Sequence, residues 1–306
     1  MENTSLAREH PPVQYRVIEG TLYARDAVHS GHEIRVHELG HGNVEATVFP
    51  TFCWSEVDSL SQFALADFAE ASKGQIWSNG GWVPYVPTEK EKLEKLTRNR
   101  ERSCRRARTK VRRLCIHKSL TTLLTLTYQE NMQDRARMCR DLDVFIKRVR
   151  RVIPDFQYLG VLEKQKRGAY HAHLAVPRVL SHYYSGGTLV RSYDLLRSMW
   201  RGVIGAGGNI DVARNKKVSR SCARLARYLS KYIGKDFDLD SEGDSYRASG
   251  RALPAAVVFR ASTAGQAFTD LMDLIAADLA QVHSSSEFYT ATLDCGGYFA
   301  SVSPVT

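Results

Sequence analysis

The sequence lacks several patterns that would assign a protein to a class at once. No stretch approaches the roughly 18 consecutive apolar residues of a membrane-spanning helix, so we expect no membrane partner. None of the six cysteines are spaced as CxxC, which excludes a zinc ribbon and a thioredoxin-type redox motif. The GxxxxGK[ST] pattern of P-loop motors is missing, and we find no internal repeat or long low-complexity tract. These absences leave a globular protein without a motor of recognisable type.

The first twenty residues are polar and do not have the pattern of a secretory signal. We therefore expect the protein in the cytoplasm, with its cysteines reduced. If the protein is encoded by a phage, that cytoplasm is the bacterial host's.

Positive charge is in excess in this chain of 306 residues, with 43 Lys and Arg against 33 Asp and Glu, a formal net charge of +10. Such a surplus favours an acidic partner, most simply a nucleic acid. The length is enough for about two domains and a substantial core.

The excess is concentrated between residues 98 and 113, where nine of sixteen residues are basic and Glu101 is the only acid. An exposed helix face would also tolerate charges, but charges of a single sign repel one another unless a polyanion lies near. We expect this segment to contact the phosphate backbone of DNA through Arg102, Arg105, Arg106, Arg108, Lys110, Arg112 and Arg113.

The composition divides the chain into four segments. Residues 1–88 are an accessory N-terminal region, 89–118 the basic DNA-contacting segment, 119–237 a mixed α/β core, and 238–306 an accessory C-terminal region. Within the core, the hydrophobic pattern predicts strands at 120–128, 156–163, 169–176 and 209–212, and helices at 134–152, 191–203 and 219–235. A strand at 255–260 and a helix at 264–282 follow.

A hairpin in the core carries candidate metal ligands. Side chains two residues apart on a strand share a face, so His171 and His173 point the same way. The five-residue connection 165–169 pairs odd positions with odd ones, which puts Glu163 on that face, opposite or diagonal to the histidines. Two imidazoles and one carboxylate suit a divalent ion with open coordination positions, Mg²⁺ or Mn²⁺. Exposed histidines would give the same HxH pattern, and a one-residue slip would move Glu163 to the other face.

The last predicted helix of the core carries two tyrosines four residues apart, Tyr228 and Tyr232, each followed three residues later by a lysine, Lys231 or Lys235. Amphipathic tyrosines that only help a helix to pack would show the same spacing. Combined with the candidate metal site, the pattern indicates transesterification of a phosphodiester. A tyrosine would attack the phosphorus, the lysines would stabilise developing charge, and the second tyrosine would accept the strand in a second transfer.

These residues resemble the HUH endonucleases, and more closely the rolling-circle replication initiators of single-stranded DNA bacteriophages, the microviruses and inoviruses. Three motifs occur in family order: Leu124–Tyr128, Tyr170–Leu174 with Glu163, and Tyr228–Lys235. The basic segment before the first motif also resembles these proteins. The likeness covers about 98–237, and the motifs are specific as a set. One departure is Ala172, which is smaller than the usual residue between the two histidines.

The resemblance implies an α+β fold with an antiparallel central sheet of four to five strands and helices packed on it. This is the ferredoxin-like or RRM-like HUH core, with the tyrosine helix across the metal face. It also implies nicking of one strand of single-stranded or origin DNA, a 5′-phosphotyrosine intermediate, and a free 3′-hydroxyl for a host polymerase. A host helicase would unwind the duplex. Tyr232 fits the one-tyrosine form of the motif best, so we rank it ahead of Tyr228 as the first nucleophile.

Three other hypotheses compete with this one. A transposase or plasmid relaxase would use the same chemistry, and a non-catalytic nucleic-acid-binding protein would have the same basic segment. The sequence His37-Glu38-Leu39-Gly40-His41 matches the HExxH signature of zinc proteases. That signature works on a helix, whereas the glycines and β-type residues around it do not favour one. We therefore expect a polar loop there.

Overall fold

The computed structural model describes residues 15–18, 21–26, 28, 30–57, 75–78, 81–84, 86–205, 207–213, 221–233, 246–250, 252–279, 286–293 and 297–304. None of the helices in these ranges is both long and apolar enough to span a membrane. The chain divides into two units. The core unit comprises residues 94–255 with 38–43 and 304–306, and the second unit comprises 1–37, 44–93 and 256–303.

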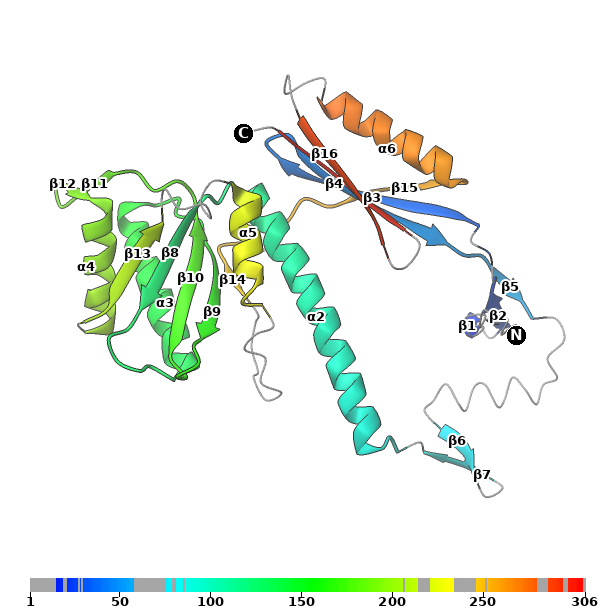
Figure 1. The fold of residues 1–306 in the computed structure, drawn as a ribbon. Coiled ribbons are helices and arrows are strands. Elements are labelled where there is room, and N and C mark those ends of the chain that lie inside the picture. Colours follow the sequence, from blue (N-terminus) through cyan, green and yellow to red (C-terminus); the bar gives the residue numbers. More distant parts are fainter. Residues whose placement is uncertain are drawn as a thin grey trace, which may run out of the picture. The chain divides into compact units, whose positions relative to one another are not determined.

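A five-stranded antiparallel sheet is the centre of the core unit (Figure 1). Its strand order is β13-β8-β10-β9-β14. The strands are β8 (Thr122–Thr127), β9 (Leu159–Lys164), β10 (Tyr170–Val176), β13 (Asn209–Ala213) and β14 (Arg247–Ala248). This sheet confirms the predicted α+β class and strand number.

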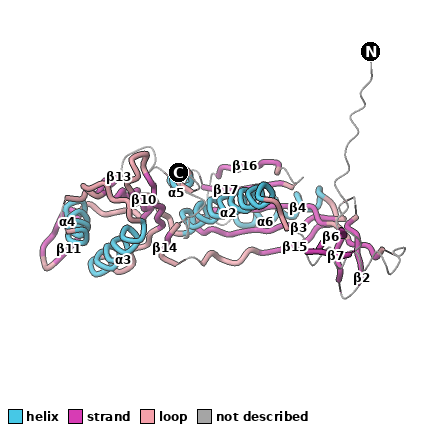
Figure 2. Tube along the Cα trace, turned by 90° about the horizontal axis from the view of Figure 1, so that it is seen from below, coloured by secondary structure: helices cyan, strands magenta, loops and turns pink. Residues whose placement is uncertain are grey.

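Two helices cover one face of this sheet, α3 (Arg135–Val152) and α4 (Ser192–Ile204) (Figure 2). Leu124 and Leu126 of β8 and Leu174 of β10 pack there against the fully buried Phe145 and Trp200. The helix ends follow local chemistry. Asp134 caps α3 by accepting a hydrogen bond from the Arg137 amide, and Gly205 ends α4 at a φ of 90°.

The opposite face of the sheet packs against α2 (Glu89–His117) and α5 (Cys222–Ser230). The buried residues of this second apolar cluster include Val111 and Leu114 of α2, Leu225 and Leu229 of α5, and Val161 of β9. Side chains alternate along each strand, so this face is also the one that carries His171 and His173. The structure thus has an apolar cluster beside a row of polar side chains on the same face.

The predicted helices 134–152 and 191–203 are confirmed within one residue. The helix predicted at 219–235 is shorter, because α5 begins after Ser221 and its last residue is Ser230. Residues 219–220 and 234–235 lie outside the described ranges. A hairpin of β11 (His182–Ser185) and β12 (Thr188–Arg191) was not predicted.

The second unit contains another five-stranded sheet, with the order β15-β3-β4-β17-β16. Its helix α6 packs on the sheet through Ala267 and Leu271. The elements are β3 (Gly31–Gly40), β4 (Asn43–Thr51), β15 (Val257–Ala261), α6 (Ala264–Leu279), β16 (Ser286–Thr292) and β17 (Tyr298–Pro304). Strands from the first and last segments of the chain therefore belong to one sheet.

Smaller strands complete the described part of this unit. They are β1 (Tyr15–Ile18), β2 (Thr21–Arg25), β5 (Trp54–Glu56), β6 (Gln75–Ser78) and β7 (Gly81–Pro84). The first three form one antiparallel sheet, and β6 pairs with β7.

The HExxH sequence lies at the end of β3, so the expectation of a polar loop is wrong. Ile34 and Val36 are buried on alternate positions, and the extended strand continues through Gly40 before His41 turns at a φ of 54°. Residues four apart on a strand are about 13 Å apart. His37 and His41 consequently lack the helical spacing that a zinc protease requires.

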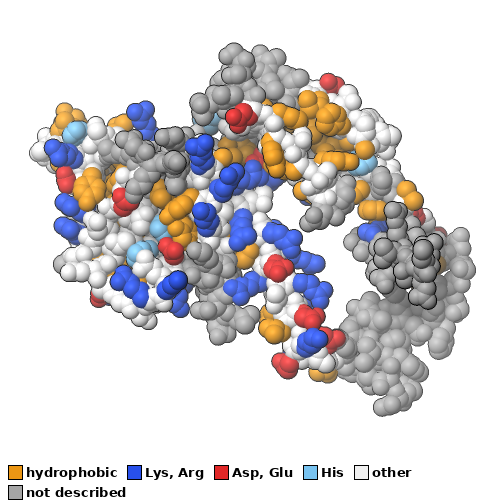
Figure 3. Space-filling model, viewed as in Figure 1, with side chains coloured by type: hydrophobic (Ala, Val, Ile, Leu, Met, Phe, Trp, Pro, Cys, Tyr) orange, Lys and Arg blue, Asp and Glu red, His pale blue; other side chains and the backbone are white. Residues whose placement is uncertain are grey.

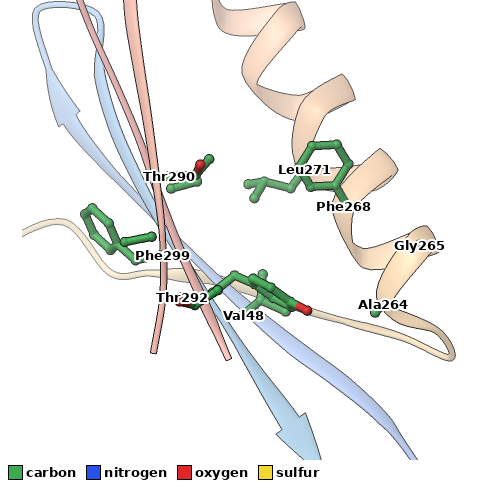
Figure 4. A pocket seen from close by; sticks show the side chains of 11 residues that line it. Val48, Ala264, Gly265, Phe268, Leu271, Thr290, Thr292 and Phe299 are labelled. Carbon is green, nitrogen blue, oxygen red and sulfur yellow. The ribbon is translucent and has the colours of Figure 1, made fainter. Parts of the chain in front are cut away.

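An apolar cavity of about 820 Å³ lies between α6 and the sheet of the second unit (Figure 4). Phe268 and Leu271 line it from α6, and Val48, Thr290 and Phe299 line it from the strands. Its described lining has no carboxylate, imidazole or amine, so this cavity offers none of the chemistry that the core motifs predict.

Candidate active site

The three predicted metal ligands share one face of the β9–β10 hairpin. His171 is paired directly with Glu163, and His173 with Val161 two positions further along. This register confirms the odd-with-odd pairing predicted from the five-residue connection. All three polar side chains therefore stand on the face that α5 covers.

His173 is the most buried of the three. Its Nε2 lies 2.8 Å from a carboxylate oxygen of Glu163, and its Nδ1 lies 3.2 Å from the Thr125 hydroxyl on β8. A hydroxyl can donate or accept, so Thr125 can hydrogen-bond His173 in either neutral tautomer. Thr125 thereby holds the imidazole ring in one orientation.

His171 is half-buried, and its Nδ1 lies 3.1 Å from the side-chain nitrogen of Gln165. Burial lowers the pKa of His171, and the neighbouring His173 lowers it further. Burial also lowers the pKa of His173, although the hydrogen bond with Glu163 opposes that change. Both imidazoles are therefore neutral at pH 7, the form in which histidine binds metals.

The donor set of one carboxylate and two neutral imidazoles fits a divalent cation by its chemistry. Of the three side chains, His173 and Glu163 meet in a direct hydrogen bond. Within the described ranges, no three His, Cys, Asp or Glu side chains form a ready ligand cluster. The structure thus brings two predicted ligands into contact and places His171 beside them on the same face.

The helix α5 places the two tyrosines over this face. Ser221 begins the helix by accepting a hydrogen bond from the Arg224 amide. Leu225 and Leu229 are fully buried against the sheet. Tyr228 lies beside this apolar stripe, and the turn after Ser230 carries Tyr232.

The rings of Tyr228 and Tyr232 contact His173 directly. Tyr232 stacks on the imidazole, with ring centroids 4.5 Å apart and planes at 13°. Tyr228 meets the same imidazole edge-on at 5.9 Å. The Tyr232 hydroxyl donates a hydrogen bond of 2.7 Å to the Tyr228 hydroxyl. Both phenol oxygens therefore lie together beside the His173–Glu163 pair.

The hydroxyl of Tyr232 is held in its protonated form. Burial raises the pKa of Tyr232 above its ordinary value, and the hydrogen bond with Tyr228 raises it further. The nearby negative charge of Glu163 acts in the same direction. A phenol in this state is a weak nucleophile, so an attack by Tyr232 requires help in releasing the proton.

The two predicted lysines differ in what the structure describes. Lys231 is exposed, and its Nζ lies 6.0 Å from the ring centroid of Tyr228. Lys235 lies outside the described ranges.

The basic segment forms the C-terminal half of α2, and Figure 3 shows Lys and Arg side chains gathered along this helix. Arg102, Arg105, Arg106, Arg108 and Lys110 are exposed, whereas Arg112 and Arg113 are half-buried. Two of these side chains have contacts that the sequence did not predict. Arg105 lies 3.7 Å from Glu101, and Arg108 donates a hydrogen bond of 2.9 Å to the carbonyl oxygen of Ile233.

Two further residues were not predicted to act at the site, namely Thr125 and Gln165, which contact the imidazoles. The hairpin connection pairs β9 with β10 but says nothing about which strand lies on the other side of β10, so Thr125 could not be placed. Tyr128 of the first motif lies on the opposite face, where its hydroxyl donates a hydrogen bond of 2.7 Å to Asp141. It is therefore separated from the candidate nucleophiles by the sheet.

Comparison with known proteins bears on the core unit alone. Residues 121–237 match a family model of replication-associated proteins, the ORF2 and gene 2 protein family. No curated protein and no solved structure matched the chain. The matched region contains the hairpin, α5 and both tyrosines, so the part of the chain that carries the candidate site is similar to replication-associated proteins.

Proposed function

We propose that the protein initiates rolling-circle DNA replication by nicking one strand at an origin. The observation that carries this proposal is the pair of tyrosine hydroxyls, 2.7 Å apart, beside the His173–Glu163 pair. The match to replication-associated proteins over the same residues supports the biological role.

In the proposed reaction, the phenol oxygen of Tyr232 attacks the phosphorus of a phosphodiester in DNA. A bond forms between that oxygen and phosphorus, and the bond between phosphorus and the 3′ oxygen of the upstream nucleotide breaks. The proton of the phenol is released to solvent or to a base, and the 3′ oxygen takes up a proton. The products are a 5′-phosphotyrosine and a free 3′-hydroxyl.

The number of phosphate ester bonds does not change in this step, so the energy for rejoining the strand is retained in the protein–DNA bond. Tyr228 can then attack in a second transfer, because its hydroxyl accepts the hydrogen bond from Tyr232 and lies at the same place. Lys231 adds positive charge next to Tyr228, where negative charge develops on the phosphate.

His171, His173 and Glu163 would hold a divalent metal ion, Mg²⁺ or Mn²⁺. When bound, such an ion polarises the phosphate oxygens and neutralises charge at the scissile bond. The protein's own contribution is orientation: Thr125 and Glu163 hold the His173 ring, and that ring supports Tyr232 by stacking.

The proposed partners follow from this chemistry. The substrate is single-stranded or origin DNA, the basic face of α2 contacts its phosphates, and a host polymerase extends the 3′-hydroxyl. Because the sequence has no P-loop motor, a host helicase would supply the unwinding.

The test is incubation of the protein with single-stranded DNA that carries candidate origin sequences and a label at either end. The reactions contain Mg²⁺ or Mn²⁺ and are separated on a denaturing gel. The protein is joined to the 5′ end of the downstream fragment, so we expect a label at the 3′ end of the DNA to remain on the protein. That adduct should disappear with EDTA or in His171→Ala. Binding without a covalent product, over both metals and a broad set of origins, would favour the non-catalytic alternative.

A further inference from the structure

Arg108 joins α2 to the turn that carries Tyr232. Its guanidinium donates a hydrogen bond of 2.9 Å to the carbonyl oxygen of Ile233, the residue directly after Tyr232. Ile233 itself is buried, with 1% of its surface exposed. The contact joins positions that are 125 residues apart in the sequence.

The carbonyl groups at this end of α5 need donors from elsewhere. The last carbonyls of a helix have no partner within the helix, and the negative end of the helix dipole lies here. The turn tightens after Ser230, where the amides of Lys231 and Tyr232 bond back to Tyr228 and Leu229. The Ile233 carbonyl lies beyond these bonds, and a guanidinium cation suits it both as a donor and by its charge.

Packing joins the same two elements. Val111 and Leu114 of α2 lie in the apolar cluster with Leu229 and Ile233, and the rings of Tyr228 and Tyr232 pack against that cluster. Figure 1 shows α5 beside the C-terminal part of α2. One helix therefore presents basic side chains to solvent and also supports the turn that carries Tyr232.

We infer that Arg108 is a positioning residue for the nucleophilic tyrosine, fixing the turn that carries Tyr232 through the Ile233 carbonyl. This inference rests on the proposed nicking function. It gives Arg108 a role different from that of its exposed neighbours on α2, which we assign to phosphate contact. DNA bound along α2 and the tyrosine turn are then held by one rigid element.

The inference is tested against the alternative that Arg108 is a simple phosphate contact. Arg108→Gln is compared with Arg105→Gln, an exposed neighbour on the same helix, and with Arg178→Gln, an exposed arginine after β10. Two quantities are measured: the rate of covalent attachment in a single turnover at saturating DNA, and the slope of log affinity against log salt concentration.

We expect Arg108→Gln to slow attachment roughly tenfold to a hundredfold, the size of effect that a small misplacement of a reacting group produces. Its salt slope should equal that of the wild type. Arg105→Gln should reduce the slope by roughly 0.7, the value for one lost phosphate contact on single-stranded DNA. Arg178→Gln should change neither quantity. A reduced slope with a normal attachment rate in Arg108→Gln would overturn the inference.

A second measurement does not depend on nicking. Amide hydrogen exchange in the segment 228–233 should be faster in Arg108→Gln than in Arg105→Gln, and Arg108→Lys, which keeps a cationic donor, should lie between Arg108→Gln and the wild type. Equal exchange in all the variants would overturn the inference even if Arg108→Gln were less stable. A wild-type protein that forms no covalent product would refute the nicking function, and the exchange result would still decide whether Arg108 holds the turn.

Discussion

At the scale of single residues, the hydroxyl of Tyr232 combines a reactive position with an unreactive state. It lies beside the His173–Glu163 pair, yet burial and the hydrogen bond with Tyr228 raise its pKa. Its proximity alone therefore does not make it a nucleophile. The arrangement keeps the phenol protonated until a substrate and its counter-charges arrive.

Replacing the tyrosines by phenylalanine isolates the role of the two hydroxyls. Phenylalanine keeps the ring that stacks on His173, so DNA affinity should stay within about twofold. Tyr232→Phe should remove most of the first covalent product, Tyr228→Phe should block the second transfer, and the double variant should form no product at all. Denaturing gels measure the product, with Tyr184→Phe on β11 as the control. A product from the double variant would show that neither tyrosine is the nucleophile.

The histidines predict how metal binding depends on pH. Burial lowers the pKa of His171 and His173 below 6.5, so both stay neutral and able to bind a cation down to a pH below that value. Protons should displace the metal as the pH falls through these lowered pKa values. Titration with Mn²⁺ at a series of pH values measures this loss.

Exposed His182 provides the control for this titration, because His182→Ala should leave the pH profile unchanged while His173→Ala should abolish binding. Loss of Mn²⁺ binding centred above pH 6.5 would contradict the assignment of these two imidazoles as ligands.

At the scale of elements, α5 depends on its first hydrogen bond. The Ser221 hydroxyl accepts from the Arg224 amide at 3.2 Å and caps a helix of nine residues. Ser221→Ala should lower the free energy of unfolding by about 1 kcal/mol. Urea denaturation measures the change, and Ser198→Ala inside α4 should be nearly neutral. Equal effects of the two substitutions would mean that the cap is not needed.

The exposed face of α2 predicts a salt effect. Neutralising Arg102, Arg106 and Lys110 as glutamines should weaken DNA binding and flatten its dependence on salt. Each lost phosphate contact should reduce the slope of log affinity against log salt by roughly 0.7 to 0.9. Fluorescence anisotropy with labelled DNA measures this slope. A slope equal to that of the wild type would place the DNA on another surface.

The elements also show what local patterns can and cannot predict. The register of the hairpin follows from side-chain alternation and the connection length, and the pairing of His171 with Glu163 confirms it. The strand order of the core sheet does not follow, because β8 and β13 meet through contacts between residues distant in the sequence. The same limit hid the contacts of Thr125 and Arg108, since each joins two elements that are far apart along the chain.

At the scale of the whole molecule, the first and last segments of the chain build one sheet. β15 pairs with β3, and β17 pairs with β4. The sequence pattern predicted only short strands in these regions and could not predict that they pair. The division of the chain into 1–88, 89–118, 119–237 and 238–306 remains a prediction, and the structure adds that strands from the first and fourth segments share a core.

This shared core predicts the effect of a truncation. Removing residues 256–306 deletes β15, α6, β16 and β17, and uncovers residues such as Ile34, Val36 and Val48, which are at most 3% exposed in the full chain. We expect the shortened protein to bind a hydrophobic dye and to aggregate. Dye fluorescence and sedimentation measure these changes against the full-length protein. A soluble, dye-free product would mean that β3 and β4 are stable without the C-terminal strands.

The pairing of β3 and β4 with β15 and β17 also imposes an order on synthesis. The ribosome makes β4 long before β15, since the intervening chain runs from residue 52 to residue 256. At the usual rate of 5 to 20 residues per second, the early strands wait roughly 10 to 40 seconds for their partners. The strands and helices of the core unit are all made within that interval. The nascent chain therefore acquires its core unit first, and completes the flanking sheet only when translation is nearly over.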